Sequence, residues 1–194
     1  GFGAVYVSSK GFTLFEISVF MVSISSFGAL AQWPIGYISD KIDRRIILIT
    51  ITFIAAGLSI FIVISSYLSF ILFIILSGIF SAMSLPMFSV AVAHVNDFLE
   101  SNEIISASST FNILIGIGSI LGPILVSSSM TLVGPNGFFI YLFLVHGTLG
   151  LFGLYRMTRR VKPRDLESQY IPLPRNISAA GMEMNPVIDS AEED

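Results

Sequence analysis

The sequence predicts an all-α polytopic membrane protein. Of its 194 residues, 54% are hydrophobic and only 12% are charged, which is about half the charged share of a typical soluble domain. Residues 17–39, 46–96 and 104–155 contain no Asp, Glu, Lys or Arg. Because a helix needs roughly 20 apolar residues to span the hydrocarbon core of a bilayer, the first stretch predicts one crossing and the other two predict two each.

Helices are the structure that we expect in all five crossings. Lipid offers no hydrogen-bond partners to the backbone, so a spanning segment must be helical or belong to a closed barrel. Barrel strands alternate apolar and polar residues, whereas residues 46–49 and 70–76 are apolar throughout. The predicted helices comprise residues 14–38, 46–65, 67–95, 104–130 and 137–156.

Short polar segments separate these predicted helices. Ser65 and Ser66 separate the second helix from the third, and residues 97–103 form a polar link to the fourth. The sequence GPNG at residues 134–137 is a strong turn signal before the fifth. Residues 1–9 resemble the end of a truncated transmembrane helix, so we expect a fragment in which residues 10–160 form the helical bundle.

The basic residues predict the orientation of the bundle. Lys41, Arg44 and Arg45 follow the first helix, and five more Lys or Arg residues lie within residues 156–164, after the last helix. Four crossings separate the two groups, so both lie on one side, which the positive-inside rule assigns to the cytoplasm. Residues 161–194 contain four prolines and seven acidic residues against three basic ones, which predicts a disordered cytoplasmic tail.

The most informative segment comprises residues 32–45, with the sequence QWPIGYISDKIDRR. A charged cytoplasmic turn would explain its basic residues but not a Gly four residues before an Asp. The segment resembles the signature of the major facilitator superfamily, Gly-x-x-x-Asp-(Arg/Lys)-x-Gly-Arg-(Arg/Lys). Five residues match it in register: Gly36, Asp40, Lys41, Arg44 and Arg45. Asp43 stands where the family usually has Gly, and we expect Asp to tolerate the left-handed backbone of such a turn.

The resemblance covers nearly the whole chain. Residues 86–97 and 170–175 are similar to a bacterial sub-branch of the family, the YcaD-like transporters. The five helices then look like crossings eight to twelve, and residues 1–9 like the end of crossing seven. The resemblance thus implies most of a C-terminal half in a bacterial plasma (inner) membrane. The partners it implies are the lipid bilayer, the missing N-terminal half of the same chain and an unidentified small-molecule substrate.

The resemblance implies a secondary transporter that moves a small solute by alternating access. In the family, contacts of the signature turn latch the cytoplasmic side closed. Asp40 lies at a helix end, where a carboxylate can meet the positive N-terminus of a neighbouring helix. Asp97, at the cytoplasmic end of the third helix, is within reach of Arg44 or Arg45. We therefore expect these residues to form a cytoplasmic gate.

Polar residues inside the predicted helices are candidates for the cavity lining. The resemblance implies that the first, third and fourth helices face the cavity, which nominates Gln32, Ser77, Ser81, Ser84 and Asn112. The alternative is that the serines bond back to their own helix or join neighbouring helices.

Glycine and proline residues predict close packing and hinges. Gly118 and Gly122 have the spacing that lets two helices approach closely. Pro86 and Pro123 are candidate hinges, because proline removes a helical hydrogen bond. His146, near the middle of the last helix, is either a neutral side chain bonded to a neighbouring helix or a group that titrates within the membrane.

Several classes of function find no support. The chain has no Cys, no His-Glu-x-x-His, no Gly-x-Ser-x-Gly and no phosphate-binding loop, so we expect no enzyme, no cofactor and no metal site. The sequence contains no basic patch with interleaved aromatic residues, so nothing in it predicts nucleic-acid binding. One alternative is a non-transporting helix bundle that serves as a sensor or assembly subunit. A hydrolytic membrane enzyme is more distant, and its candidate is His146 with a serine of another helix.

Overall fold

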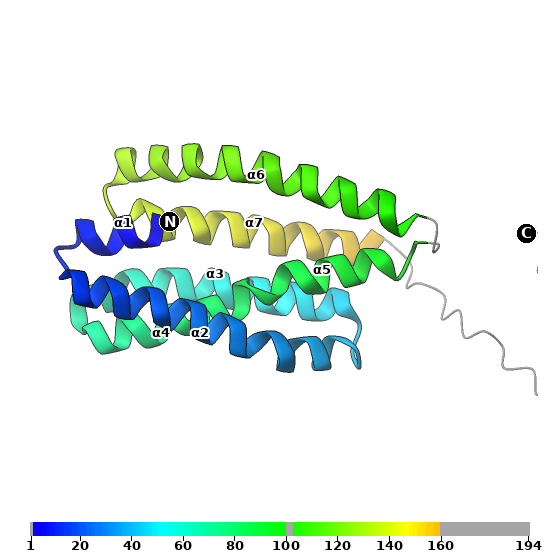
Figure 1. Cartoon of the computed structure of the whole chain (residues 1–194), viewed down its shortest axis with the longest axis horizontal. Helices are drawn as coiled ribbons and strands as arrows, with labels where there is room; N and C mark the ends of the chain where they lie inside the picture. The colour runs from blue at the N-terminus through cyan, green and yellow to red at the C-terminus, as the bar shows by residue number, and fades with distance from the viewer. Residues whose placement is uncertain (1, 100–102, 160–194) are drawn as a thin grey trace, which may run out of the picture. The chain divides into compact units, whose positions relative to one another are not determined.

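A computed structural model describes residues 2–99 and 103–159, and the predicted tail of residues 161–194 lies outside the described residues. All the regular structure in this part of the chain is helical, as predicted (Figure 1). The helices are α1 (Phe2–Ser9), α2 (Leu14–Ser39), α3 (Arg44–Leu68), α4 (Phe70–Ser84), α5 (Pro86–Asn96), α6 (Ile104–Val133) and α7 (Gly137–Arg159). Five segments are long and apolar enough to cross a membrane: α2, α3, α4 together with α5, α6, and α7. This confirms the five predicted crossings.

The turn between the second and third crossings lies at Ser69, not at the predicted pair of Ser65 and Ser66. Ser69 has an extended backbone, with φ −161° and ψ 131°. The hydroxyls of Ser65 and Ser66 donate to the carbonyls of Ile62 and Val63, at 2.9 and 2.8 Å, inside α3. Serine side chains can be satisfied by their own helix in this way, so the pair does not end it.

The third crossing is interrupted at its centre. Helix α4 ends at Ser84 and α5 begins at Pro86, with Leu85 between them. Proline has no N–H to donate to the carbonyl of Ala82, and its ring crowds that carbonyl. At the first position of a new helix, the missing N–H has no consequence. One candidate hinge, Pro86, therefore coincides with a break, whereas α6 continues through the other, Pro123.

Small residues bring α2 and α4 close together. A Cβ atom on Gly28 would lie 2.8 Å from Ser81 Oγ, and one on Gly78 would lie 2.9 Å from the Phe27 ring. A hydrogen bond also joins the two helices, because the Ser81 hydroxyl of α4 donates to the Ile24 carbonyl of α2 at 2.6 Å. Close backbone approach and interhelical hydrogen bonds are the usual means of helix association in lipid.

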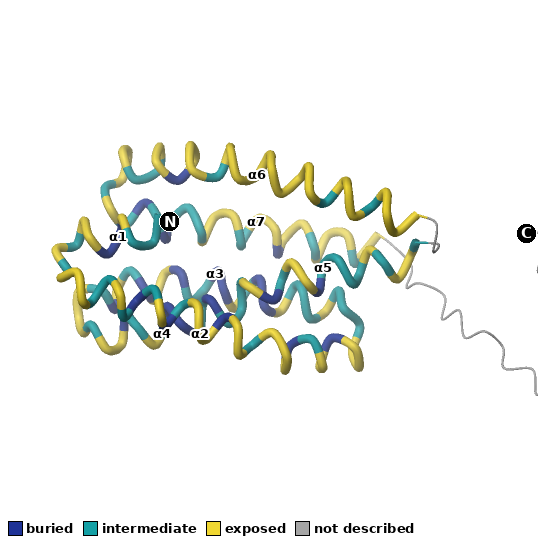
Figure 2. Tube along the Cα trace, in the orientation of Figure 1, coloured by how far each residue is buried: buried dark blue, intermediate teal, exposed yellow. Residues whose placement is uncertain are grey.

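Two apolar clusters fill the interior. One gathers aromatic side chains from α1 and the N-terminal parts of α2, α4 and α7, and includes Tyr6, Phe20, Phe73 and Phe139. The other joins α2, α3 and α5 through Ile35, Ile51 and Val90. Figure 2 shows the buried positions concentrated on α2, α3 and α4.

Helix α6 is the least buried of the crossings. Only Val126 is buried along it. In its most apolar stretch of 18 residues, 6% of the residues are buried, against 33% in α3. Figure 2 shows α6 exposed along almost its whole length. A Cβ atom on Gly118 or Gly122 would meet no atom of residues 2–99 or 103–159 within 4 Å. The close packing expected of these glycines therefore finds no partner among the described residues and stays a prediction.

Candidate functional site

The signature turn joins α2 to α3 through two acidic helix caps. Asp40 closes α2, and its N–H donates to the Gly36 carbonyl at 3.0 Å. Asp43 opens α3, and its carboxylate accepts from the N–H of Arg45 at 3.0 Å. The φ of Asp43 is −49°, so the left-handed backbone expected there is wrong. Asp replaces the family's usual Gly as a helix cap, a role for which its carboxylate is well suited.

Arg44 connects the ends of three helices. Its Nη2 lies 2.9 Å from Asp40 Oδ1 at the end of α2, and its Nη1 lies 3.1 Å from Asp97 Oδ1 at the end of α5. The guanidinium group offers several donors in a fixed plane, so one side chain can serve two carboxylates. The structure thus brings together three of the predicted gate residues.

Arg45 turns instead to the neighbouring cap. Its Nε lies 3.0 Å from Asp43 Oδ1 and its Nη2 lies 2.7 Å from Asp43 Oδ2, which is a two-point contact. Hydrogen bonds from this guanidinium hold the pKa of Asp43 below its ordinary value, against a smaller opposing effect of partial burial. Asp43 is therefore ionised at neutral pH, and the pair stabilises the turn locally without joining two crossings.

The Arg44 bridge is partly exposed and therefore weak. The side-chain exposure is 22% for Arg44, 67% for Asp40 and 48% for Asp97. Ion pairs with this much access to solvent contribute about 0–1 kcal/mol each. A contact of that strength can break and re-form within a conformational cycle, whereas a buried and fully desolvated pair would resist such a change.

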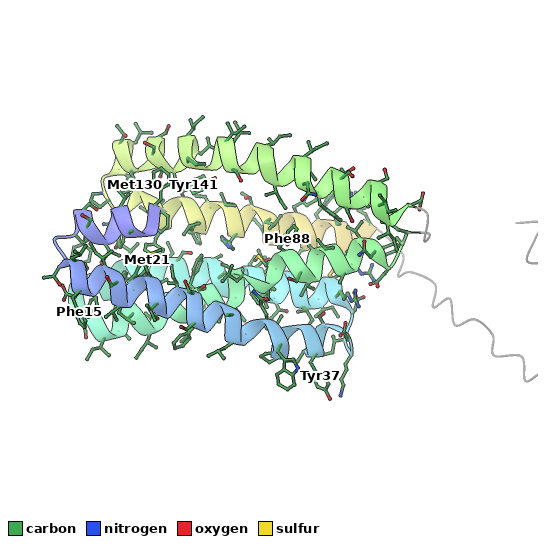
Figure 3. All side chains as sticks on the ribbon, viewed as in Figure 1. Phe15, Met21, Tyr37, Phe88, Met130 and Tyr141 are labelled. Carbon is green, nitrogen blue, oxygen red and sulfur yellow. The ribbon has the colours of Figure 1, made fainter. Side chains whose placement is uncertain are left out.

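The remaining signature residues point elsewhere. The Nζ of Lys41 lies 4.1 Å from the ring centroid of Tyr37 and donates to its hydroxyl. Tyr37 projects away from the bundle in Figure 3. A Cβ atom on Gly36 would meet nothing within 4 Å in the described part of the chain.

The predicted cavity residues differ in exposure and in hydrogen bonding. Gln32 and Asn112 are exposed on α2 and α6. Ser77 is buried, and its hydroxyl has no partner among the described residues. Ser81 bonds to α2, and Ser84 bonds to α7, which is the alternative role of joining helices. Contact of any of the five with a substrate stays a prediction.

His146 joins α7 to the break in the third crossing. Its Nδ1 lies 2.8 Å from the Leu142 carbonyl, and its Nε2 lies 3.1 Å from Ser84 Oγ. A carbonyl only accepts, so Nδ1 carries a proton, and in the neutral ring Nε2 then accepts from the Ser84 hydroxyl. This arrangement agrees with the neutral, interhelical histidine of the sequence analysis.

A second polar cluster, at the other end of α3, was not recognised in the sequence. The Nζ of Lys10 lies 3.7 Å from the ring centroid of Tyr67, and Asn136 Nδ2 donates to the Tyr67 hydroxyl at 2.9 Å. The one signal in the sequence is that Lys10 is the only Lys or Arg among residues 1–40. Among the described residues, no group of three His, Cys, Asp or Glu side chains is placed to hold a metal ion.

Comparison with known proteins identifies the family. Residues 2–181 match the model described as the Major Facilitator Superfamily. The uncharacterized MFS-type transporter YcaD of Escherichia coli, from strains K12 / DH10B, O157:H7 and O139:H28, is 27% identical over 142 residues. No solved structure matches the chain.

The match with YcaD covers 73% of this chain but 36% of the relative, so the chain spans about a third of the length of these curated relatives. The family match covers most of the chain and includes the signature turn and all five apolar crossings. The chain is an integral multi-pass membrane protein and belongs to the major facilitator superfamily.

Proposed function

We propose that the chain is part of a secondary transporter that moves a small solute across the membrane by alternating access. Membership of the family supports membrane transport in general. The observation that carries the mechanism is the Arg44 bridge, which ties the ends of α2, α3 and α5 together at one end of the bundle.

The Arg44 bridge can favour one of the two conformations of an alternating-access transporter. In alternating access the two halves of a transporter rock around a central site, and each side opens in turn. Only the Arg44–Asp97 pair differs between the two states, and an exposed pair of up to about 1 kcal/mol would favour the state that contains it by up to roughly fivefold. That bias is large enough to set a resting state and small enough to be overcome during each cycle.

The break in the third crossing would let this gate open. Asp97 closes α5, and α5 is joined to α4 only through Leu85 and Pro86. The end of α5 can therefore swing away from Arg44 while α4 keeps its contacts with α2 and α3, and the swing must also loosen the packing of Val90 against Ile35 and Ile51. On this proposal Pro86 is the hinge and the pair of Arg44 and Asp97 is the contact that breaks.

The rest of the transporter would cover α6. The curated relatives of this chain are almost three times as long as the segment that matches it, and α6 exposes apolar side chains along its length. We assign this face to an N-terminal half of the same protein, with the solute bound between the halves. The basic residues of the signature turn favour the cytoplasmic side for that turn and for the C-terminal tail, by the positive-inside rule, and the bacterial relatives favour a bacterial membrane.

The gate can be tested without knowing the solute. Gln32 is exposed on α2, about two turns inside the bridge, and the chain has no other thiol because it contains no Cys. Gln32→Cys in the full-length protein, freed of any cysteines elsewhere, would report the opening of the cytoplasmic end to a membrane-impermeant maleimide. Arg44→Gln should raise the labelling rate in inside-out vesicles several-fold.

A neighbouring residue provides the matched control. Arg45→Gln removes the same charge from the same turn but breaks only the local contact with Asp43, so it should leave the labelling rate unchanged. The exchange Arg44→Asp with Asp97→Arg should partly restore slow labelling. Equal labelling of the Arg44 and Arg45 variants would show that the bridge is not a gate. A wild-type protein that moves none of a broad panel of solutes in proteoliposomes would argue against transport.

A further inference from the structure

Three side chains form a column on the exposed face of α2. Trp33, Tyr37 and Lys41 follow one another at intervals of four residues, and Trp33 is 79% and Tyr37 is 53% exposed. The two ring centroids are 6.1 Å apart and the ring planes are 19° from parallel. The Lys41 Nζ lies over the Tyr37 ring at 4.1 Å. The column thus runs from an apolar aromatic face to a cation at the end of the helix.

The position of the column places its cation at the membrane surface. Lys41 lies two residues beyond the apolar crossing of α2, which ends at Ser39. The same arrangement recurs at the end of α7, which lies at the same end of the bundle (Figure 1): Arg156 lies 5.8 Å from the Phe152 ring centroid and Arg159 lies 5.7 Å from that of Tyr155. Aromatic rings and basic side chains concentrate at the level of the lipid headgroups.

Lys41 differs from its basic neighbours in that no carboxylate of the described residues pairs with it. Arg44 and Arg45 each contact a carboxylate. Among the described residues, Lys41 contacts the ring and hydroxyl of Tyr37 and lies within 4 Å of no carboxylate. An aromatic ring positions an ammonium group without neutralising it, so Lys41 presents a fixed positive charge to whatever lies beside α2.

We propose that the column of Trp33, Tyr37 and Lys41 binds an anionic phospholipid. The Lys41 ammonium pairs with the phosphate of the headgroup, and the first segment of an acyl chain lies against the exposed faces of Tyr37 and Trp33. A lipid is the partner that offers an anion and an apolar chain at this separation in one molecule. A free phosphate ion would leave the two exposed aromatic rings without a partner.

Trp33 itself provides a direct test, because it is the only tryptophan of the chain. The full-length protein is placed in phosphatidylcholine vesicles that contain either brominated phosphatidylcholine or brominated phosphatidylglycerol at the same mole fraction. Bromine quenches the fluorescence of a tryptophan that it touches. The difference between wild type and Trp33→Phe isolates the signal of Trp33, and phosphatidylglycerol should quench it more strongly than phosphatidylcholine.

The variants assign this preference to one charge. Lys41→Gln should reduce the relative binding constant for phosphatidylglycerol by about fivefold, the effect of one Lys near an anionic surface. Lys41→Arg should keep the preference, which shows that the turn tolerates substitution. Arg159→Gln, at the same end of α7, should leave quenching of Trp33 unchanged.

Three results would overturn the proposal. If neither brominated lipid quenches Trp33, another part of the protein covers this residue. Equal quenching by both lipids in the wild type shows ordinary contact with the bilayer. Loss of the preference on adding millimolar inorganic phosphate at constant ionic strength identifies a site for a free anion instead.

Discussion

The seam between α2 and α4 gives the sharpest prediction for the fold. Gly28→Ala places a methyl group 2.8 Å from Ser81 Oγ and 3.1 Å from Leu85 Cγ. The Leu85 side chain is 48% exposed and can rotate away. Ser81 cannot move freely, because its hydroxyl donates to the Ile24 carbonyl at 2.6 Å. The two helices must therefore separate, or this hydrogen bond must weaken.

The size of the effect follows from comparison with a glycine that has space around it. A Cβ atom on Gly57 of α3 would meet no other described residue within 4 Å. Both Gly28→Ala and Gly57→Ala gain about 1 kcal/mol of helix propensity, and this gain cancels in the difference between them. What remains is the overpacking at Gly28, about 1–3 kcal/mol. Gly28→Ala should thus be less stable than Gly57→Ala by about 2 kcal/mol.

The two variants can be compared by unfolding the full-length protein in mixed micelles. Titration with sodium dodecyl sulfate, followed by circular dichroism, gives the free energy of unfolding of each variant and of the wild type. A double variant, Gly28→Ala with Ser81→Ala, should recover part of the loss, because the smaller side chain leaves room for the new methyl group. Equal stabilities of the Gly28 and Gly57 variants would refute the close approach of α2 and α4.

Three further predictions concern single contacts. Asp43→Asn keeps a good helix cap but loses the ion pair with Arg45, so it should destabilise by up to about 1 kcal/mol at pH 7. Because the Arg45 hydrogen bonds lower the native pKa of this carboxyl, the wild type should lose that stabilisation only as the pH falls below the ordinary Asp pKa and through the lowered native one, and acid titration of both forms checks this. Ser84→Ala and His146→Phe should each destabilise by about 1 kcal/mol and be non-additive in a double-mutant cycle, since they share one hydrogen bond. Gly137→Ala should destabilise by about 2–3 kcal/mol in the same unfolding assay, because its methyl group would lie 2.6 Å from the backbone carbonyl carbon of Ser129, which cannot rotate away.

The number and nature of the crossings could be predicted because the bilayer imposes both. Apolar length and the absence of charges are properties of the sequence alone, and they give the five spans that the structure contains. The ends of the helices were less predictable. Ser65 and Ser66 resemble a turn in composition, yet their hydroxyls are satisfied inside α3 and the chain turns at Ser69.

The partners of the polar residues were harder to predict than their positions. Sequence spacing placed Arg44 and Asp97 at the same end of the bundle, but two arginines were equally possible partners for Asp97. The choice of Arg44 depends on Asp43, which caps α3 and holds Arg45 beside itself. The close approach at Gly28 was not predicted, because it requires knowing which helix lies opposite.

The charged residues of the signature turn divide into groups that affect different properties. Asp43 and Arg45 act within the turn, so their loss should lower stability without changing the accessibility of Gln32→Cys. Arg44 acts between helices, so its loss should change accessibility more than stability. Lys41 acts toward the lipid, so its loss should matter only in anionic membranes. If these residues served topology alone, the variants at positions 41, 44 and 45 would behave alike in all three measurements, because each removes one positive charge from the same turn.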